Sequence, residues 1–457
     1  MAFRDTSVLN RRAFLAGSAL CLSSASANAL VQIAEMRGSI EAPELGLLPN
    51  TGTDQTQQFQ SAVNRAVENG RALFLPAGIY PVANLRFPSG SLIVGIPGRT
   101  RLVYQGGGGL LARAEGVSNI GLTGITFDGA NRTIGEFTEG LLHFIGVRNL
   151  TLENCEIAGS TRTGLLVDRC SGRIENCRIS GAAEAGIRSN EADGLSIIGN
   201  TVADCANGGI WVHRWRDGED NTIVSGNRVE RIGAKYGGTG QFGNGINVFR
   251  AHGVTVSNNK VSDCAFSAIR SNAGSNVQIV GNTCLRSGET AIYSEFGFQG
   301  ALISSNIVDG GTMGISIANF MDGGRLAVCS NNLIRNLTTQ GPYKPEVAGF
   351  GIGIAAEADT TITGNVIEGA PRFGMLLGWG PYMRNLVASQ NIVRQCGTGI
   401  AVSVVEGVGS AVISGNIIQG SENGAITGYR WLDKATGELN GSDEFPSLSV
   451  TGNQISA

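Results

Sequence analysis

A motif of the form apolar-x-Gly-Asn-x-apolar recurs along this chain, for example as Ile197-Ile-Gly-Asn-Thr-Val202 and as Val450-Thr-Gly-Asn-Gln-Ile455. Two earlier copies carry Cys155 and Cys177 in place of the asparagine. Successive copies are about 22 to 37 residues apart, which suits one coil of a β-solenoid. The asparagines of this column are Asn200, Asn227, Asn259, Asn282, Asn306, Asn332, Asn365, Asn391, Asn416 and Asn453.

The repeat predicts an all-β chain built from about 12 stacked coils. Helical repeats are excluded because the apolar residues lack a 3.6-residue periodicity. Each coil would stack about 4.8 Å from the next, so that the stack buries an apolar core that one coil cannot bury alone. We expect the column asparagines to occupy sharp turns in the left-handed conformation and to hydrogen-bond from coil to coil through their amides.

The composition agrees with many short strands joined by tight turns. Glycine accounts for 68 of 457 residues, and only 16% of residues are charged, against about 25% in ordinary domains. A hydrophobic content of 42% excludes a disordered chain. The net charge of −3 provides no basic field that would attract nucleic acid.

The N-terminus has the features of an export signal. The pair Arg11-Arg12 precedes a short apolar stretch, and Ala27-Asn28-Ala29 supplies the small residues that a signal peptidase needs. We expect residues 1–29 to be a twin-arginine signal peptide cleaved after Ala29. The mature protein would then be periplasmic or secreted, exported folded by the twin-arginine machinery, with no membrane span after cleavage.

A helix is predicted before the coils, within an N-terminal segment of residues 30–110 that also contains the first coils. Asp54 with Gln57 resembles a capping box, and Gly70 ends the helix. Its apolar face would cover the open first coil of the solenoid. Residues 111–457 would form the β-helix repeats, as one continuous domain with residues 30–110. The excursion 429–446 is expected either to cap the rod or to contact a partner.

The segments Leu75-Pro-Ala-Gly-Ile-Tyr80 and Asn119-Ile-Gly-Leu-Thr-Gly-Ile125 resemble the pectin-lyase-like superfamily of single-stranded right-handed parallel β-helices. With Arg11-Arg12, the chain resembles more closely a family of twin-arginine-exported repeat proteins of unassigned activity. The resemblance implies a right-handed helix over residues 50–457. It leaves the activity open, because the superfamily contains lyases, hydrolases, epimerases and non-enzymes.

A second repeated pattern, Gly-Ile, predicts a strand in every coil, as in Gly186-Ile187, Gly209-Ile210 and Gly245-Ile246. Alternation along these strands places two rows of side chains on the outer face. In the central coils these rows are polar or aromatic: Arg188, Trp211, Asn247, Arg270 and Tyr293 in the first, and Asn190, His213, Phe249, Asn272 and Glu295 in the second. Long insertions flanking the strands would wall a groove above the rows. Of the other histidines, His143 is expected near an inward position and His252 in a turn.

This groove is predicted to bind an acidic polysaccharide, because arginines hold planar carboxylates and aromatic rings stack on sugars. The predicted substrate-binding residues are Arg188, Asn190, Trp211, Arg214, Arg216, Asn247, Arg250, Asn272, Asn319 and Arg325. The predicted catalytic residues are His213, Arg270, Tyr293 and Glu295.

The leading hypothesis is lyase or C5-epimerase chemistry on a uronate, in which Arg270 neutralises the carboxylate and His213 and Tyr293 exchange protons. His213 and Tyr293 would lie two coils apart. A non-catalytic glycan-binding or envelope-structural solenoid is a second hypothesis, and a glycoside hydrolase using Glu295 as its acid is a third. The pattern indicates no metal site and no cofactor.

Overall fold

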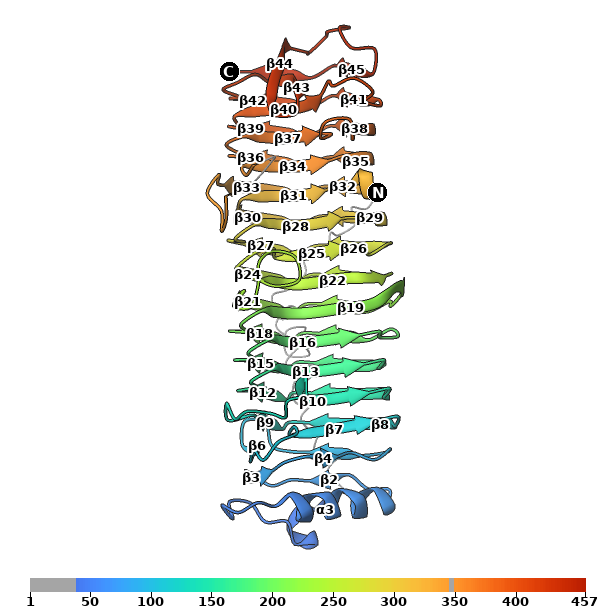
Figure 1. Cartoon of the computed structure of the whole chain (residues 1–457), viewed down its shortest axis with the longest axis vertical. Coiled ribbons are helices and arrows are strands. Elements are labelled where there is room, and N and C mark those ends of the chain that lie inside the picture. Colours follow the sequence, from blue (N-terminus) through green and yellow to red (C-terminus); the bar gives the residue numbers. More distant parts are fainter. Residues whose placement is uncertain (1–37, 345–348) are drawn as a thin grey trace, which may run out of the picture.

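The computed structural model describes residues 38–344 and 349–457 as a long rod of stacked coils (Figure 1). The predicted signal peptide, residues 1–29, lies outside the described residues. Each coil contributes one strand to each of three sheets, which contain 16, 15 and 15 strands. Neighbouring strands pair in parallel throughout the first and third sheets, and in the second up to its last pair. The predicted all-β parallel β-helix is therefore confirmed.

We refer to the three sheets as A, B and C. Sheet A runs from β1 (Ile40–Glu41) and β2 (Leu73–Phe74) to β45 (Leu448–Thr451). Sheet B runs from β3 (Gly78–Val82) to β46 (Gln454–Ser456). Sheet C carries the Gly-Ile strands and comprises β4 (Leu85–Arg86), β7 (Ala112–Glu115), β10 (Gly140–Ile145), β13 (Thr163–Asp168), β16 (Ala185–Asn190), β19 (Gly208–Glu219), β22 (Asn244–His252), β25 (Ile269–Asn272), β28 (Thr290–Glu295), β31 (Met313–Ile317), β34 (Ile352–Ala356), β37 (Phe373–Leu377), β40 (Thr398–Ser403), β43 (Ile426–Arg430) and β44 (Asp433–Glu438).

The asparagine column forms a continuous ladder at the turn between sheets A and B. The Asn282 Nδ2 atom donates to Asn306 Oδ1 at 3.0 Å and to the backbone oxygen of Val256 at 2.9 Å, and the same pattern repeats from coil to coil. All ten asparagines are buried. The expectation that they adopt the left-handed conformation is wrong. The residue before each of them does so, as with Gly199 at φ 67° and Asn258 at φ 56°, which is why glycine or asparagine so often precedes the column.

Both ends of the rod are covered. The helix α3 (Thr56–Glu68) closes the first coil with Phe59, Ala62, Val63 and Ala66 buried. It begins one residue later than expected, after Gln55, and the Asp54 carboxylate still accepts the backbone N–H of Thr56 at 2.9 Å. At the other end, β44 pairs antiparallel with β43. The excursion 429–446 therefore folds back on the last coil of sheet C.

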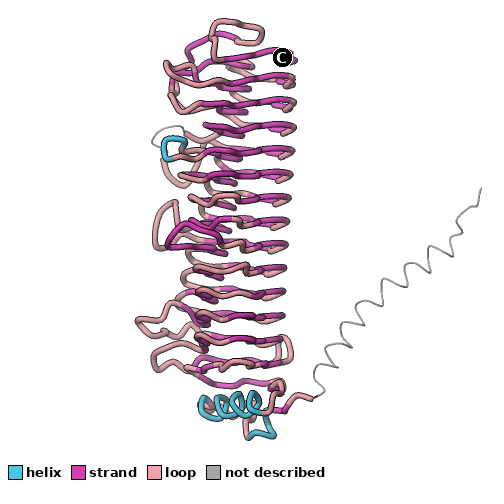
Figure 2. The backbone as a smooth tube through the Cα atoms, turned by 90° about the vertical axis from the view of Figure 1, so that its right-hand side faces the viewer, coloured by secondary structure: helices cyan, strands magenta, loops and turns pink. Residues whose placement is uncertain are grey.

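Loops project from one side of the rod, and the opposite side is nearly flat (Figure 2). The loop between β21 (Arg228–Ile232) and β22 lies against sheet C, where the ring of Phe242 is 6.2 Å from that of Trp211. The projecting loop between β21 and β22 thus packs on the outer face of sheet C.

Candidate functional site

The two outer rows predicted on sheet C are confirmed by the strand register. Arg188 pairs with Trp211, Trp211 with Asn247, Asn247 with Arg270, and Arg270 with Tyr293. The second row runs from Asn190 through His213, Phe249 and Asn272 to Glu295 in the same register. These side chains therefore form two vertical columns on one face.

The columns are not an open groove floor, as the sequence suggested, but are largely covered by loops. Trp211, His213, Arg270 and Glu295 are only 2%, 8%, 7% and 3% exposed. Thr239, from the loop before β22, accepts a hydrogen bond from Arg270 at 2.8 Å. The loops bury this part of the surface, so that only the groups at its margins reach solvent.

A cavity of about 150 Å³ opens beside the covered region. It is lined by Arg188, His213, Trp215, Gly240, Gln241, Asn247, Phe249 and Asn272. Trp215, which is 64% exposed, belongs to neither outer row, but the sequence already indicated that its ring could stack on a sugar. The Arg188 guanidinium lies 5.8 Å from its ring centre. The cavity thus has an aromatic wall and a cation at its edge.

His213 forms part of the cavity floor as a buried, neutral imidazole. Its ring stacks on Trp211 at 5.2 Å and meets Phe249 edge-on at 5.8 Å. Burial, with a smaller contribution from the Arg188 charge, lowers the pKa of His213 to about 3. Among the described residues, neither His213 Nε2 nor Asn247 Oδ1 has a hydrogen-bond partner. Two buried polar atoms in the cavity lining are therefore left without a hydrogen-bond partner within the described part of the chain.

The lowered pKa of His213 predicts a loss of stability in acid. The unfolded chain takes up a proton near pH 6.5 and the folded chain only near pH 3, so the stability present above pH 6.5 is lost as the pH falls towards 3. Between pH 7 and pH 4.5 this residue should account for about 2 kcal/mol of the loss. Urea unfolding at both pH values should show a shallower pH dependence for His213→Phe than for the wild type. Equal pH dependence in the two proteins would contradict the assignment.

Arg270 is held in a buried ion-pair cluster rather than presented to a ligand. Its Nε and Nη2 atoms bind both oxygens of Glu295 at 2.6 and 3.0 Å, and its Nη1 lies 3.7 Å from Glu289. Thr239 and Tyr343 both donate hydroxyl hydrogen bonds to Glu289. Burial opposes the charge of Arg270, but the two carboxylates outweigh it and raise its pKa.

The other predicted catalytic groups belong to the same cluster. Burial raises the pKa of Tyr293 to about 12, and its ring lies under the Arg270 guanidinium at 4.9 Å. Burial also raises the pKa of Glu295, although Arg270 and Asn272 both stabilise the carboxylate. His213 is three strand steps from Tyr293, not two, or about 14 Å between backbones. The structure therefore brings Arg270, Tyr293 and Glu295 together and leaves His213 apart from them.

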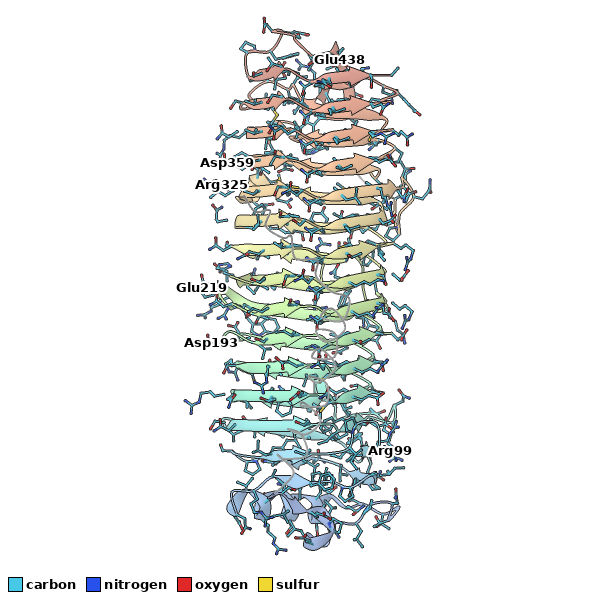
Figure 3. The ribbon with its side chains drawn as sticks, turned by 180° about the vertical axis from the view of Figure 1, so that it is seen from behind. Arg99, Asp193, Glu219, Arg325, Asp359 and Glu438 are labelled. Carbon is cyan, nitrogen blue, oxygen red and sulfur yellow. The ribbon has the colours of Figure 1, made fainter. Side chains whose placement is uncertain are left out.

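The remaining predicted binding residues have different surroundings. Arg214 pairs with Glu191 at 2.8 Å, and Arg250 donates to the Trp215 backbone oxygen at 3.0 Å. Asn319 accepts the backbone N–H of Phe296 at 3.2 Å, and Arg216 is exposed on β19. Arg325 is the first residue of β32 (Arg325–Ser330), an interior strand of sheet A, and pairs with Asp359 at 2.7 Å (Figure 3). Arg325 is thus displaced from the outer face of sheet C.

One polar pair on sheet C escaped the sequence analysis. His143 faces outward, not inward, and its Nε2 lies 2.7 Å from Asp168 Oδ2. Asn190 donates to the other Asp168 oxygen at 2.6 Å and accepts from Arg188 Nε at 3.2 Å. The prediction was wrong because Gly140 pairs with Thr163 and not with Gly164, which shifts this coil by one residue.

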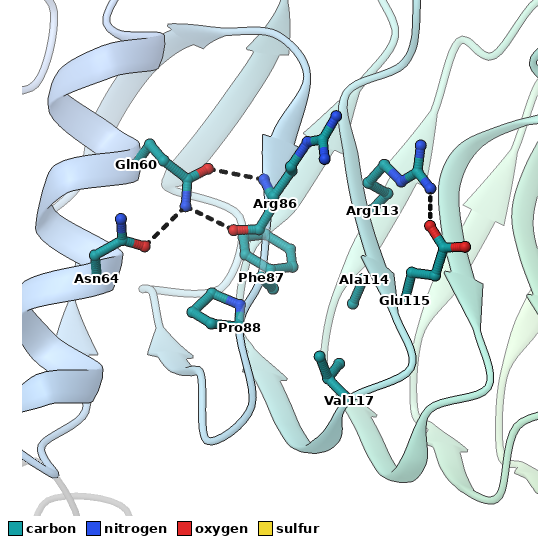
Figure 4. A pocket seen from close by; sticks show the side chains of 9 residues that line it. All are labelled: Gln60, Asn64, Arg86, Phe87, Pro88, Arg113, Ala114, Glu115 and Val117. Carbon is teal, nitrogen blue, oxygen red and sulfur yellow. Dashed lines mark hydrogen bonds and ion pairs between the residues drawn. The ribbon is translucent and has the colours of Figure 1, made fainter.

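The first outer column also continues to the N-terminal end of sheet C, through Arg113 to Arg86. There a second cavity, of about 360 Å³, lies between α3 and the first strands (Figure 4). Gln60 holds the backbone of Arg86 through bonds of 2.8 and 2.7 Å, and Arg113 pairs with Glu115. The same strand alternation places Arg86 in β4 and Arg113 in β7 on the outer face of the first coils, and this is the sequence signal that could have located them.

Within residues 38–344 and 349–457, no group of three or more His, Cys, Asp or Glu side chains is arranged to hold a metal ion. In the same described part, no helix is long and apolar enough to cross a membrane.

Comparisons with known proteins agree with the fold. A search of curated proteins found no match. The N-terminal fragment of bacteriophage phi29 gene product 12 is 16% identical, with a TM-score of 0.51, over 93% of this chain and 73% of that chain. A mannuronan C-5 epimerase A-module from Azotobacter vinelandii is 16% identical, with a TM-score of 0.44, over 92% and 99%. An α-1,3-glucanase catalytic unit from Streptomyces thermodiastaticus is 13% identical, with a TM-score of 0.45, over 92% and 69%.

A family model for right-handed β-helix regions matches residues 99–229 and 215–322. The twin-arginine repeat family remains a prediction. The sheets, the asparagine ladder and the family match together identify the chain as a right-handed parallel β-helix protein.

Proposed function

We propose that this protein binds an acidic polysaccharide over sheet C, with one sugar ring in the cavity between Arg188, Trp215 and Phe249. The observation that carries the proposal is the cavity itself, in which the exposed Trp215 and the ring of Phe249 form aromatic walls and the Arg188 guanidinium lies at the edge. The aromatic faces suit the apolar face of a pyranose.

The acidic character of the ligand follows from Arg188. Its Nε and Nη1 atoms bind Asn190 and Glu139, and its Nη2 has no partner among the residues that the structure describes. Glu139 is 59% exposed in its side chain, so a ligand carboxylate can replace it without disturbing the core. A guanidinium beside an aromatic wall recognises a carboxylate on a stacked ring.

Of the three activities predicted from the sequence, the geometry favours binding without catalysis. Lyase or epimerase chemistry through Arg270 would require a guanidinium free to bind substrate, and this one is taken by Glu295 and Glu289. A base with a pKa of about 3, such as His213, removes protons poorly at neutral pH. Hydrolysis by Glu295 would require an acid that water and substrate can reach, and Glu295 is 3% exposed.

The His143–Asp168 pair supports lyase or C5-epimerase activity as a second candidate function. Asp168 holds one imidazole nitrogen, which leaves the other for a substrate proton, and Asn190 links the pair to Arg188. Unsaturated uronate absorbance and deuterium exchange at C5 would detect this chemistry. His143→Gln should abolish either signal while binding is retained. Turnover that survives this change would exclude His143 as the base.

Binding can be tested by calorimetric titration with oligouronates and with neutral oligosaccharides of equal length. Trp215→Ala should weaken binding of both about tenfold, since it removes the stacking wall. Arg188→Ala should weaken only the acidic ligands. Trp431→Ala and Arg178→Ala are matched controls away from the cavity and should leave the affinity unchanged. No binding of any acidic glycan by the wild type would refute the proposed function.

We also propose export through the twin-arginine pathway, on the evidence of Arg11-Arg12 and Ala27-Asn28-Ala29. Replacing both arginines by lysine should retain the full-length chain in the cytoplasm. Cell fractionation with N-terminal sequencing of the exported form would test both the pathway and the cleavage after Ala29.

A further inference from the structure

The outer surface of the C-terminal coils has an uncharged band that the N-terminal coils lack. The band crosses the turn between sheets A and B on five consecutive coils. It consists of the segments Leu302–Ile307, Val328–Leu333, Thr361–Val366, Val387–Ile392 and Val412–Ile417. None of them contains a charged residue, whereas among the earlier coils the corresponding turns of four carry Glu156, Arg178, Arg228 and Lys260, which interrupt any such band.

The band exposes a straight column of aliphatic side chains on sheet B. Five strands contribute one residue each: Ile307 in β30 (Ile307–Gly311), Leu333 in β33 (Leu333–Leu337), Val366 in β36 (Val366–Glu368), Ile392 in β39 (Ile392–Arg394) and Ile417 in β42 (Ile417–Gln419). Ile307, Ile392 and Ile417 are 41%, 36% and 45% exposed. A contiguous exposed apolar surface of this kind marks a protein–protein contact.

A column of alternating charge runs beside the aliphatic one. Two residues further along the same strands lie Asp309, Arg335, Glu368 and Arg394, in register on successive coils. Arg335 pairs with Asp309 at 2.8 Å, and Arg394 with Glu368 at 3.2 Å. All four side chains remain between 29% and 49% exposed, so they can bind further partners.

We infer that this surface joins two copies of the chain into an antiparallel dimer. The two copies would be related by a two-fold axis that runs along the strand direction and passes between β33 and β36. Each column of one copy then faces the same column of the other copy, and the two rods run in opposite directions. Arg335 then faces Glu368 of the second copy, and Asp309 faces Arg394 of the second copy. The aliphatic column meets the aliphatic column, with Ile307 opposite Ile392 of the second copy.

A parallel dimer does not satisfy the same surface. In a parallel dimer each coil would face the same coil of the second copy, and the charged column of one copy would lie against the uncharged band of the other. The charged side chains would then lose water without gaining partners of opposite charge. The alternating signs therefore select the antiparallel arrangement. This dimer leaves sheet C and its cavity open, so it is independent of the proposed function.

Sedimentation velocity of the full chain over a range of micromolar concentrations tests the dimer. The wild type should sediment as a dimer, and Ile392→Glu should convert it to a monomer. Thr201→Glu, in the same column but on the N-terminal coils, is the matched control and should remain dimeric. A wild type that is monomeric throughout, or a dimer that Ile392→Glu does not affect, would overturn the inference.

Charge reversal tests the pairing across the axis. Glu368→Arg should weaken the dimer at least tenfold, because it then faces Arg335. The double variant Arg335→Glu/Glu368→Arg should restore it, although it places like charges on neighbouring coils within each chain. Failure of the double variant to recover, with circular dichroism showing a folded rod, would argue against this contact.

Cross-linking would show whether the two copies in the dimer are antiparallel or parallel. The eight cysteines of the described residues are buried, so an introduced surface thiol reacts selectively with a short bismaleimide once Cys21, outside those residues, is replaced by serine. Ile307→Cys and Ile392→Cys should cross-link when the two variants are mixed and not when each is treated alone. Cross-linking within either variant alone would indicate a parallel dimer and contradict the proposal.

Discussion

Replacing Asn282 by alanine should lower the free energy of unfolding by about 4 kcal/mol, because it interrupts the asparagine ladder at its centre. The side chain donates to the Val256 carbonyl and accepts two hydrogen bonds from Asn259, both in the preceding coil, and it donates to Asn306 in the next coil. Each buried partner left without a bond costs about 1–3 kcal/mol. Thermal and urea unfolding followed by circular dichroism would measure the loss.

Two further variants provide controls for this prediction. Asn282→Cys should destabilise less, because Cys155 occupies the same column and its Sγ donates to the Leu122 carbonyl at 3.3 Å. Asn64→Ala, on the exposed face of α3, should be nearly neutral. Equal stability of Asn282→Ala and Asn64→Ala would show that the ladder contributes nothing to the fold.

Replacing Arg270 by methionine should be as damaging, with a cost of about 3–5 kcal/mol, because it leaves two buried carboxylates without their cation. The pH dependence follows from the same cause. Without Arg270 the pKa of Glu295 rises further, so stability is retained below the pKa of the unfolded carboxyl, near 4.3, and is lost as the pH rises above it. Urea unfolding at pH 5 and pH 8 should show the larger deficit at pH 8.

The controls for this prediction separate a structural from a ligand-binding role. Arg286→Met breaks an exposed pair with Asp263 and should change stability little. Adding Glu295→Gln to Arg270→Met should recover part of the loss, because one unpaired charge is removed. A fully stable Arg270→Met variant that no longer binds acidic glycans would instead support the sequence-based prediction that Arg270 holds a substrate carboxylate.

Much of the fold could be predicted because one rule repeats in every coil. The Gly-Ile pattern determined which residues of sheet C face outward, and the register confirmed both columns. The rule failed at His143, where the glycine is displaced by one residue. The expectation for the asparagine column also failed in one respect, because the left-handed conformation falls on the residue before each column asparagine.

The candidate site was harder to predict, because loops have no periodicity to count. Sequence alone showed that Arg270 and Glu295 lie on neighbouring strands, but not that they pair with each other. Nor did it show that Thr239 and Tyr343 approach the cluster from loops remote in the chain. Likewise, the sequence indicated that Trp215 could stack on a sugar, but only the structure showed that it lies beside Arg188 in the cavity lining.

The sequence by itself determined the coil, the stacking direction and the columns on each face, because hydrogen bonding between identical coils propagates one local pattern along the whole rod. Only the tertiary structure decided which polar groups are buried in ion pairs and which remain open to a ligand. Burial and pairing depend on long-range contacts between strands and irregular loops. An arginine on the outer face is either held in an ion pair by a carboxylate of its own chain or left free to bind a ligand, and these contacts decide which.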